Sequence, residues 1–477
     1  MASVKKNFAY QSVYQVVAIV LPLLTSPYIS RVLGAEKIGI YSYTYAVAYY
    51  FLIVAQLGIK NYGNKEIAAA RDDGDRLNTV FSELLIVHGF FSTLSVAAYY
   101  AYVLLFVTED KTCALLQGFW VISGMFDVSW LYFGLEKFRM TVTRSTVVKI
   151  AMTACIFLFV KERQDLWIYI TIMAFGTFLS QLVLWPFLNK YITLKRVTVK
   201  GMRRHIWPMF VLFLPTIAVS FYKYMDKIML GLISDKVQVG FYENAERAIN
   251  IPVSVIASFG TVMLPRMSNL VSRGDTEKGK QYILTSMKWV MCLSLAMAFG
   301  MAAVADNFSV VFWGDEFEAC GQLIVMLCIT IPFLSFADII RMQYLIPGGK
   351  NHIYVLSVTV GAIVNVVINS LFIPRMGAEG AAVGTIFAEI SVCVVQAAAV
   401  RKNLPVFLYL RNMVYFLLTG ILMFAAVYKM EQSMTYGVIH LLLQILTGVV
   451  IYGICALIYF TVTGDETLRN MAGRFRK

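Results

Sequence analysis

The sequence predicts an all-α polytopic membrane protein with about 14 transmembrane helices, arranged as two six-helix lobes followed by two C-terminal helices. The first observation is composition: 59% of the 477 residues are apolar and 14% are charged, whereas soluble proteins are about 45–50% apolar and about 25% charged. The second is a mean hydropathy of +0.69. The third is that apolar stretches of about 20 residues, long enough for a helix to cross a bilayer, recur along the whole chain.

Fourteen apolar stretches are long enough to serve as spans. The fifth and the thirteenth are the shortest, and the ends of all of them carry an error of a few residues. No loop between them is large enough for a separate soluble domain, so the function must be performed within the membrane. The expected spans are 8–30, 38–60, 80–106, 114–133, 146–160, 167–188, 206–230, 239–264, 283–305, 318–340, 353–373, 378–400, 413–428 and 437–461.

Basic residues are distributed unequally between the two sides of these spans. With both termini placed in the cytoplasm, 30 Lys and Arg residues fall on the cytoplasmic side and 8 on the other side. Cytoplasmic loops of membrane proteins carry such an excess, so we predict that the N-terminus and the C-terminus are both cytoplasmic. The same excess accounts for the net charge of +13, and no nucleic-acid partner is expected.

A motif in the first half of the chain recurs about 200 residues later. Ser30–Tyr41 reads SRVLGAEKIGIY, and Phe221–Tyr242 contains DKIMLG, SDK and VGFY in the same order, with a longer loop. Internal repeats indicate that a fold is built from equivalent units. Because the same number of spans precedes the motif in each half, the two halves share one orientation and form parallel repeats.

The repeat divides the chain into four parts. We expect an N-lobe at 1–188 with spans 1–6, a cytoplasmic basic linker at 189–205, a C-lobe at 206–400 with spans 7–12, and spans 13–14 with a cytoplasmic tail at 401–477. Matched prolines support this division, because Pro22 and Pro27 lie in the first span and Pro208 and Pro215 in the seventh. Interrupted helices in equivalent positions point to the transport site of repeat-built transporters, although proline is also common in ordinary membrane helices.

Neither a metal site nor a catalytic site is predicted. The seven cysteines form no CxxC pair, and the four histidines have no metal-binding spacing, so the cysteines are interpreted as small buried apolar residues. We expect no cofactor and no catalytic residue. A membrane glycosyltransferase or polymerase needs catalytic groups, usually on a sizeable extramembrane loop, and the sequence has no such loop.

Charged residues inside the spans are the candidate functional residues, because an ionisable group at mid-bilayer costs at least about 2.5–3.5 kcal/mol. Lys223, Asp226 and Lys227 fall at i, i+3 and i+4, on one face of the seventh span. A cavity lined by such cations would attract an anionic ligand such as phosphate. Alternatively, these charges neutralise one another or extend to the interface. The candidates for substrate binding are Arg31, Lys223, Asp226, Lys227 and Arg247.

Three further groups are candidates for coupling transport to an ion gradient. Asp127 and His88 lie at similar depths in the fourth and third spans, and Glu243 precedes Arg247 by one helical turn. Buried Asp, Glu and His residues take up protons in membrane proteins, but a hydrogen-bonded contact between helices explains them equally well. The tyrosine-rich run Tyr41–Tyr50 has two interpretations as well, an interfacial aromatic belt or a surface that stacks on sugar rings.

Three segments resemble the polysaccharide flippases of bacteria, the O-antigen or Wzx-like group. They are SPYISRVLGAEKIGIYSYTYAVAYYFLIVAQLGIKNYGNKEIA, YMDKIMLGLISDKVQVGFYENAERAINIPVSVIASFGTVMLPRMS and IPRMGAEGAAVGTIFAEI. The resemblance covers the whole chain, and the superfamily also holds multidrug exporters and lipid II flippases. Arg31 and Asp226 lie on the family's motif, whereas Lys223, Lys227 and Arg247 are cations in the same region whose roles are our inference.

The resemblance implies two lobes around a central cavity and alternating access. The substrate would be an undecaprenyl-diphosphate-linked oligosaccharide, carried from the inner to the outer leaflet of the bacterial cytoplasmic membrane. We expect a polysaccharide polymerase, glycosyltransferases and membrane lipids as partners, and the sequence leaves open whether a proton, a sodium ion or the membrane potential drives the cycle. Two alternatives stay open, a cation-coupled multidrug exporter of the same superfamily and a non-transporting scaffold of a polysaccharide assembly complex.

Overall fold

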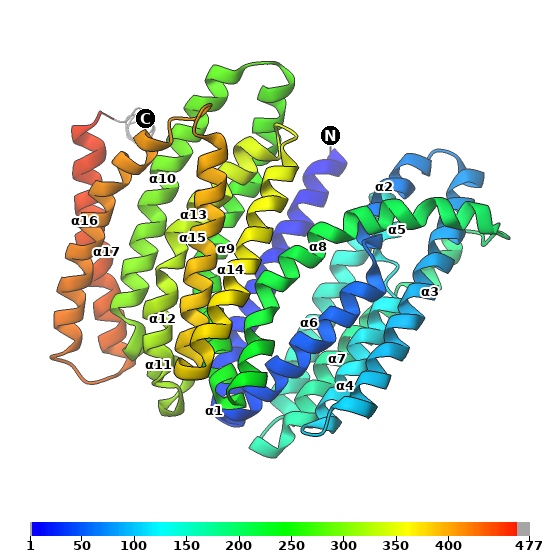
Figure 1. Cartoon of the computed structure of the whole chain (residues 1–477), viewed down its shortest axis with the longest axis horizontal. Helices are drawn as coiled ribbons and strands as arrows, with labels where there is room; N and C mark the ends of the chain where they lie inside the picture. The colour runs from blue at the N-terminus through cyan, green and yellow to red at the C-terminus, as the bar shows by residue number, and fades with distance from the viewer. Residues whose placement is uncertain (1, 465–477) are drawn as a thin grey trace. The chain divides into compact units, whose positions relative to one another are not determined.

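The computed structural model describes residues 2–464 of the chain, and every regular element within that range is helical (Figure 1). Thirteen of these helices are long and apolar enough to cross a membrane. The prediction of an all-α polytopic membrane protein is therefore confirmed. The predicted cytoplasmic tail after residue 464 lies outside the described residues, and the parallel repeat layout stays a prediction.

The difference between fourteen expected spans and thirteen observed helices arises at the start of the chain. The first expected span and most of the second fall within α1 (Ala2–Gln56), which is interrupted at Gly34 (φ 78°, ψ 172°). A side chain disfavours positive φ, so glycine suits this point of direction change. The first two expected spans are thus separated by a change of direction at one residue rather than by a loop.

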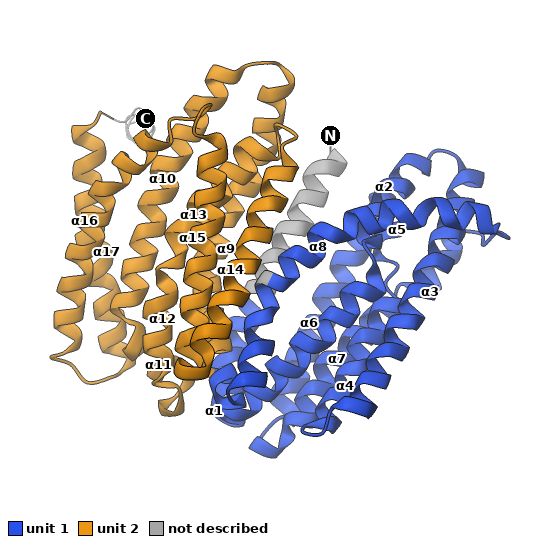
Figure 2. Ribbon diagram, in the orientation of Figure 1, with its two compact units in different colours: residues 1–240 blue, residues 241–477 orange. Residues whose placement is uncertain are grey.

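The chain forms two compact units, Met1–Gly240 and Phe241–Lys477 (Figure 2). In unit 1, a core of buried aromatic and aliphatic side chains surrounds Trp130, which is fully buried and stacks on Phe81 with ring centroids 5.2 Å apart. Unit 1 contains α1, α2 (Ile59–Ala70), α3 (Gly74–Phe106), α4 (Lys111–Met125), α5 (Ser129–Gly134), α6 (Phe138–Phe159), η1 (Arg163–Asp165), α7 (Leu166–Leu182), η2 (Trp185–Lys190) and α8 (Val199–Ile233).

Unit 2 has its own core, in which Phe416, Met423 and Phe460 pack between α10, α16 and α17. Its first helix, α9 (Lys236–Ser272), begins at the end of unit 1. The others are α10 (Thr276–Ala303), α11 (Ala305–Trp313), η3 (Asp315–Phe317), α12 (Cys320–Cys328), α13 (Thr330–Ile340), the π-helix η4 (Arg341–Leu345), α14 (Asn351–Met376), α15 (Ala378–Val400), α16 (Val406–Glu431) and α17 (Val438–Val462).

Three helices are longer than the sequence indicates. The two shortest expected spans belong to α6, with 22 residues, and α16, with 26 residues. The third is α8, which begins at Val199, inside the expected linker 189–205, because the Thr198 hydroxyl caps the helix by accepting from the Gly201 amide. Figure 1 shows α8 crossing one end of unit 1 and then turning to run along its helices, and Pro208 and Pro215 both lie within it.

Candidate functional site

The charged residues of the seventh expected span lie on the second half of α8. Asp226 and Lys227 are buried, with 4% and 7% of their surface exposed, whereas Lys223 is exposed. Because α8 is continuous through this segment, the i, i+3 and i+4 spacing places all three on one helical face. The face therefore combines one accessible ammonium group with two buried charged groups.

Aromatic side chains from three helices of unit 1 pack together next to these lysines, with Tyr224 as the ring that both lysines approach. Tyr45 of α1 stacks on Trp120 of α4 with ring centroids 4.0 Å apart, and Tyr49 lies 4.1 Å from Tyr224 of α8. Tyr45 and Tyr49 face the same way because they are four residues apart on a helix. We call Tyr45, Tyr49, Trp120, Tyr224, Lys223 and Lys227 the cation–aromatic cluster.

The lysines of this cluster lie close to an aromatic face. The ammonium groups of Lys223 and Lys227 are 5.9 Å and 5.6 Å from the centre of the Tyr224 ring, within the range of a cation–π attraction. Ammonium groups bind phosphate as compact point charges. Arg31, the equivalent candidate of the first motif, is an exposed residue of α1, three positions before Gly34.

Asp127 and His88 are brought together, but Asp127 also has a local structural role. Its Oδ1 accepts hydrogen bonds from the Ser129 amide at 3.0 Å and the Ser129 hydroxyl at 2.5 Å, at the break between α4 and α5. Its Oδ2 lies 3.5 Å from the Lys60 ammonium. His88 is fully buried beside the Asp127 carboxylate, and neither of its ring nitrogens has a hydrogen-bond partner among the described residues.

Glu243 and Arg247 lie in unit 2, on α9, and pair with each other as their spacing suggests. The Arg247 Nε donates to Glu243 Oε1 at 2.8 Å, and Arg247 also reaches Asn244 at 3.5 Å. Glu243 is buried and Arg247 is half-buried. This geometry agrees with the alternative of mutual neutralisation for this pair.

A second buried ionic network in unit 1 was missed by the sequence reasoning. Glu83 of α3 accepts from Arg204 at 2.6 Å and lies 3.0 Å from His205 Nε2, while His205 Nδ1 is 2.9 Å from the Tyr62 hydroxyl. Glu83 and His205 are 4% and 2% exposed. A carboxylate in an otherwise apolar helix was the available signal, but its partners lie more than 120 residues away in the sequence.

Unit 2 contains another partly buried pair at the end of α13. Arg341 pairs with Asp338, three residues earlier, and donates to the Tyr354 hydroxyl at 3.4 Å. The π-helix begins at Arg341, and π-helical turns are frequent at functional positions. Each residue of this pair thus has a polar partner in the structure.

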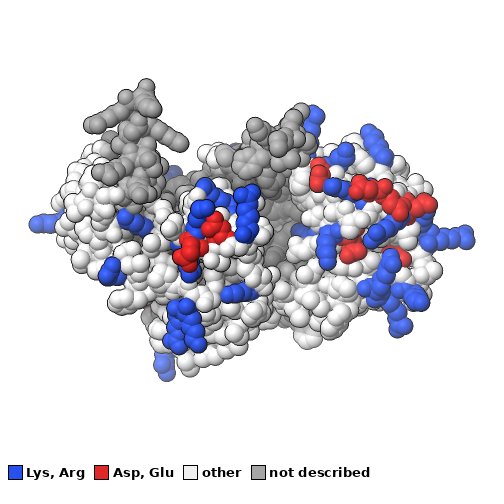
Figure 3. Space-filling model, turned by 90° about the horizontal axis from the view of Figure 1, so that it is seen from above, with Lys and Arg blue, Asp and Glu red and all other residues white. Residues whose placement is uncertain are grey.

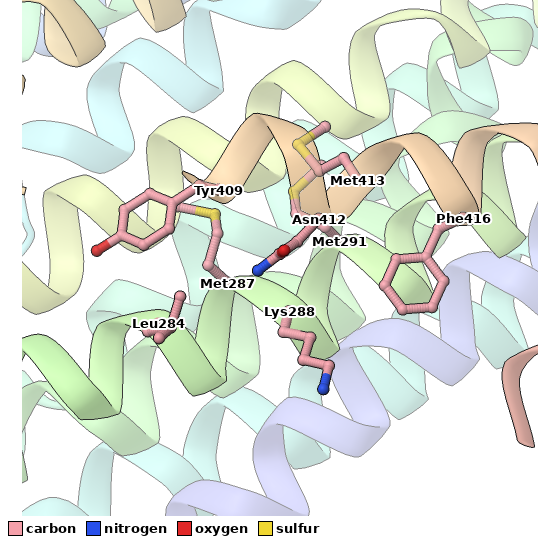
Figure 4. Close-up of a pocket in the computed structure, with 8 residues that line it drawn as sticks. All are labelled: Leu284, Met287, Lys288, Met291, Tyr409, Asn412, Met413 and Phe416. Atoms are coloured by element: carbon pink, nitrogen blue, oxygen red, sulfur yellow. The ribbon is translucent and has the colours of Figure 1, made fainter. Parts of the chain in front are cut away.

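Each unit contains a hollow between its helices, and the two hollows differ in size. A cavity of about 300 Å³ in unit 1 is lined by residues of α1, α3, the α3–α4 loop, α8 and Lys236. In unit 2, Lys288 and several methionines line a crevice between α10 and α16 that has no room for a water molecule (Figure 4). The Lys288 ammonium lies 4.9 Å from the Phe460 ring, so this crevice is interpreted as packing.

Charged side chains gather at the end of unit 1 that is seen in Figure 3. At α2 and the start of α3, ion pairs of 2.6 Å join Arg71 to Glu136 and Lys195 to Asp75. The Glu136 carboxylate raises the pKa of Arg71 through a hydrogen bond. Exposed pairs of this kind contribute little to stability, so they mark a solvated end of the helices.

The sequence of the chain matches a known protein family and an individual transporter protein. Residues 4–271 match the profile of a family described as "Polysaccharide biosynthesis protein". A Shigella dysenteriae protein named "Putative O-antigen transporter" is 23% identical over 406 residues, which is 83% of this chain and 100% of that protein.

Two solved structures show the fold that the chain shares. A structure entitled "Lipid II flippase MurJ, inward closed conformation" matches 95% of this chain and 99% of its own, with a TM-score of 0.78 at 16% identity. An inward-facing multidrug resistance MATE family transporter of the MOP superfamily matches 82% of this chain and 99% of its own, with a TM-score of 0.56 at 13% identity.

Proposed function

Because the chain belongs to the polysaccharide biosynthesis protein family, we propose that it is a membrane flippase that translocates an undecaprenyl-diphosphate-linked oligosaccharide. In this proposal the head group passes from the inner to the outer leaflet of the bacterial cytoplasmic membrane by alternating access. The chain acts as a transporter and not as an enzyme. The names of the O-antigen transporter and the lipid II flippase support this class of substrate.

The observation that carries the proposal is the cation–aromatic cluster of unit 1. Lys223 and Lys227 bring ammonium groups into an apolar helix bundle, beside the ring of Tyr224. Charges are costly among helices that face lipid, and the exposed Lys223 leaves an ammonium group accessible to an anionic diphosphate. The exposed Lys223 gives the first contact, and the buried Lys227 gives a second contact one turn further along α8.

The remaining candidates take supporting roles in the proposal. Arg31 and Asp226 belong to the repeated motif and shape the path of the head group, and Arg247 is a further cation for the head group, with Glu243 as its resting partner. Asp127, His88 and Glu243 couple the cycle to a proton or sodium gradient. The termini face the cytoplasm, where glycosyltransferases supply the substrate, and a polysaccharide polymerase uses the product.

The multidrug exporter is the alternative within the same superfamily. The likeness to a MATE transporter concerns the fold alone, and a cluster with two lysines suits an anionic ligand better than a cationic drug. A scaffold without transport would not need lysines within a membrane helix. A drug-resistance assay in cells with and without the protein separates the exporter from the flippase.

The test is reconstitution of the full chain into vesicles that contain a fluorescent undecaprenyl-diphosphate-linked oligosaccharide. We expect head groups to move between leaflets, and we expect Lys223→Ala with Lys227→Ala to lower the rate by roughly tenfold or more, since each lost charge contact is worth about 1.5–3 kcal/mol. The matched control is Lys137→Ala, because the Lys137 ammonium lies at a similar 5.8 Å from the ring of Tyr191. Equal rates in all variants would show that the cluster does not bind the head group, and absence of movement with the wild-type chain would reject the function.

A further inference from the structure

The 300 Å³ cavity of unit 1 has an aromatic wall and a fixed cation. Tyr43, Tyr102 and Phe106 line it together with Thr44 and Thr108. The Lys236 ammonium lies 3.5 Å from the centre of the Tyr43 ring and donates to the Gly231 carbonyl at 2.9 Å. Lys236 is therefore already satisfied by the ring and the carbonyl, and it holds Tyr43 in place rather than presenting a free charge.

The charges around this cavity disfavour phosphate. Two carboxylates, Glu109 and Asp110, line it against the single ammonium of Lys236. Burial raises the pKa of the Asp110 carboxyl above its usual value, and the neighbouring Lys236 and Lys37 oppose that rise. Carboxylates and hydroxyl groups form hydrogen bonds with a polyhydroxylated ligand, and aromatic rings pack against it. None of these groups attracts an anion.

The size of the cavity limits what it holds. Ligand cavities in proteins span about 300–1,000 Å³, so this one lies at the lower end and suits a single ring rather than an oligosaccharide. Apolar ring faces stack on apolar sugar faces, while the rim supplies hydrogen bonds. An amino sugar would gain a further attraction from the excess of carboxylates.

The cavity lies one helical turn from the cation–aromatic cluster. Gly231 lines the cavity and follows Lys227 by four residues, which corresponds to about 6 Å along the axis and to the same face of α8. The ring of Tyr43 occupies the space that a side chain at position 231 would need. A diphosphate held at Lys227 would therefore place its first sugar next to this cavity.

We propose that this cavity is a saccharide subsite, which binds the neutral or amino sugar ring attached to the diphosphate. The inference rests on the proposed flippase function and adds its sugar-binding surface. The lysines of the cluster hold the diphosphate, and Tyr43 and the carboxylate rim hold the sugar. The two parts of the head group are thus recognised by separate groups of residues, which lie beside adjacent turns of α8.

The test is saturation-transfer NMR on the full purified chain, with two kinds of probe. The sugar probes are glucose, galactose, mannose, rhamnose, N-acetylglucosamine and glucosamine, and the anionic probe is inorganic pyrophosphate. We expect at least one sugar to bind, with affinity roughly tenfold weaker in Tyr43→Ala and in Thr108→Trp, which fills the exposed rim. Pyrophosphate binding should be unchanged in both variants and lost when Lys223 and Lys227 are replaced by Ala.

The matched control is Tyr282→Ala, which also removes a tyrosine that carries a cation, Arg266, over its ring at 4.2 Å, but in unit 2. This variant should retain sugar binding. Binding of none of the sugars, or sugar binding that persists in both Tyr43→Ala and Thr108→Trp, overturns the subsite. Flipping of the lipid-linked oligosaccharide is measured separately, so a failed subsite with intact flipping leaves the proposed function standing.

Discussion

Gly39 lies against the backbone of Gly240, its counterpart in the second copy of the repeated motif. A Cβ atom built on Gly39 would lie 3.0 Å from the Gly240 nitrogen and would overlap the Lys236 carbonyl. A Cβ atom on Gly240 would in turn overlap the Ala35 carbonyl. The two copies of the motif therefore meet at their glycines, where the absence of side chains permits close backbone approach.

We expect Gly39→Ala to destabilise the protein by about 1–3 kcal/mol, the usual cost of overpacking, because the neighbouring group is backbone and has little freedom to move away. The thermal unfolding midpoint of the purified chain measures this change. The control is Gly89→Ala in α3, where an added Cβ meets nothing within 4 Å. Alanine should stabilise that helix position by about 0.5–1 kcal/mol, and a Gly39→Ala variant as stable as Gly89→Ala would contradict the close contact.

Removal of the Glu83 carboxylate should destabilise unit 1. Glu83→Ala leaves the buried His205 without its carboxylate partner, while the half-exposed Arg204 rehydrates. Breaking a buried pair costs about 3–5 kcal/mol. Because Arg204 is partly exposed and can rehydrate, we expect a loss of about 3 kcal/mol, at the lower end of that range. Thermal unfolding measures it.

The control for this network is an exposed pair whose acidic member, Asp75, lies on the same helix as Glu83. Lys195→Ala removes the partner of Asp75, whose side chain is 88% exposed, so it should cost less than about 1 kcal/mol. Similar losses for Glu83→Ala and Lys195→Ala would show that the buried network does not stabilise α8 against α3.

The membrane fold could be predicted from the sequence because each span is a local signal. About 20 apolar residues identify a helix without knowledge of its neighbours, and thirteen helices within residues 2–464 meet that description. The junction at Gly34 was harder to predict, because the chain reverses there without the loop that separates most spans. Likewise, the helical start of α8 depends on one hydroxyl, that of Thr198.

The candidate site could be predicted only where its residues share one helix. The spacing of Lys223, Asp226 and Lys227 revealed their common face, but not the rings around them. The tyrosine-rich run left two interpretations open, because the sequence does not show what each helical face contacts. In the structure Tyr45 stacks on Trp120, whereas Tyr43 lines a cavity, so one run of tyrosines serves two different surfaces.

Asp306, which lies between two spans, should make stability depend on pH. Burial raises the pKa of its carboxyl above the usual 3.8, and Glu318 adds to the effect. Its stabilising contribution is present below pH 3.8 and is lost as the pH rises through the raised pKa. Asp306→Asn should therefore raise the unfolding midpoint at pH 7, with a difference that shrinks as the medium is acidified.

Asp275 supplies the opposite control. A hydrogen bond from Lys278 lowers the pKa of the Asp275 carboxyl, so its contribution is present above the usual 3.8 and is lost as the pH falls through the lowered pKa. Asp275→Asn should lower the unfolding midpoint at pH 7, and this difference should vanish in acid. A midpoint for Asp306→Asn below that of the wild type at pH 7 would refute the assigned sign.

Substitutions at Asp127 and Ser129 separate the effect of the Asp127 charge on transport from the effect of its hydrogen bonds on stability. In Asp127→Asn the side-chain oxygen still accepts from the Ser129 amide and hydroxyl, and the Lys60 side chain, 55% exposed, rehydrates. We expect a loss of less than about 1 kcal/mol in stability, but a flipping rate that no longer responds to an imposed proton or sodium gradient. Ser129→Ala should show the reverse, because it removes a hydrogen bond worth about 1 kcal/mol or more and keeps the carboxylate opposite Lys60. If the gradient still accelerates flipping by Asp127→Asn, the carboxylate serves only to join α4 to α5.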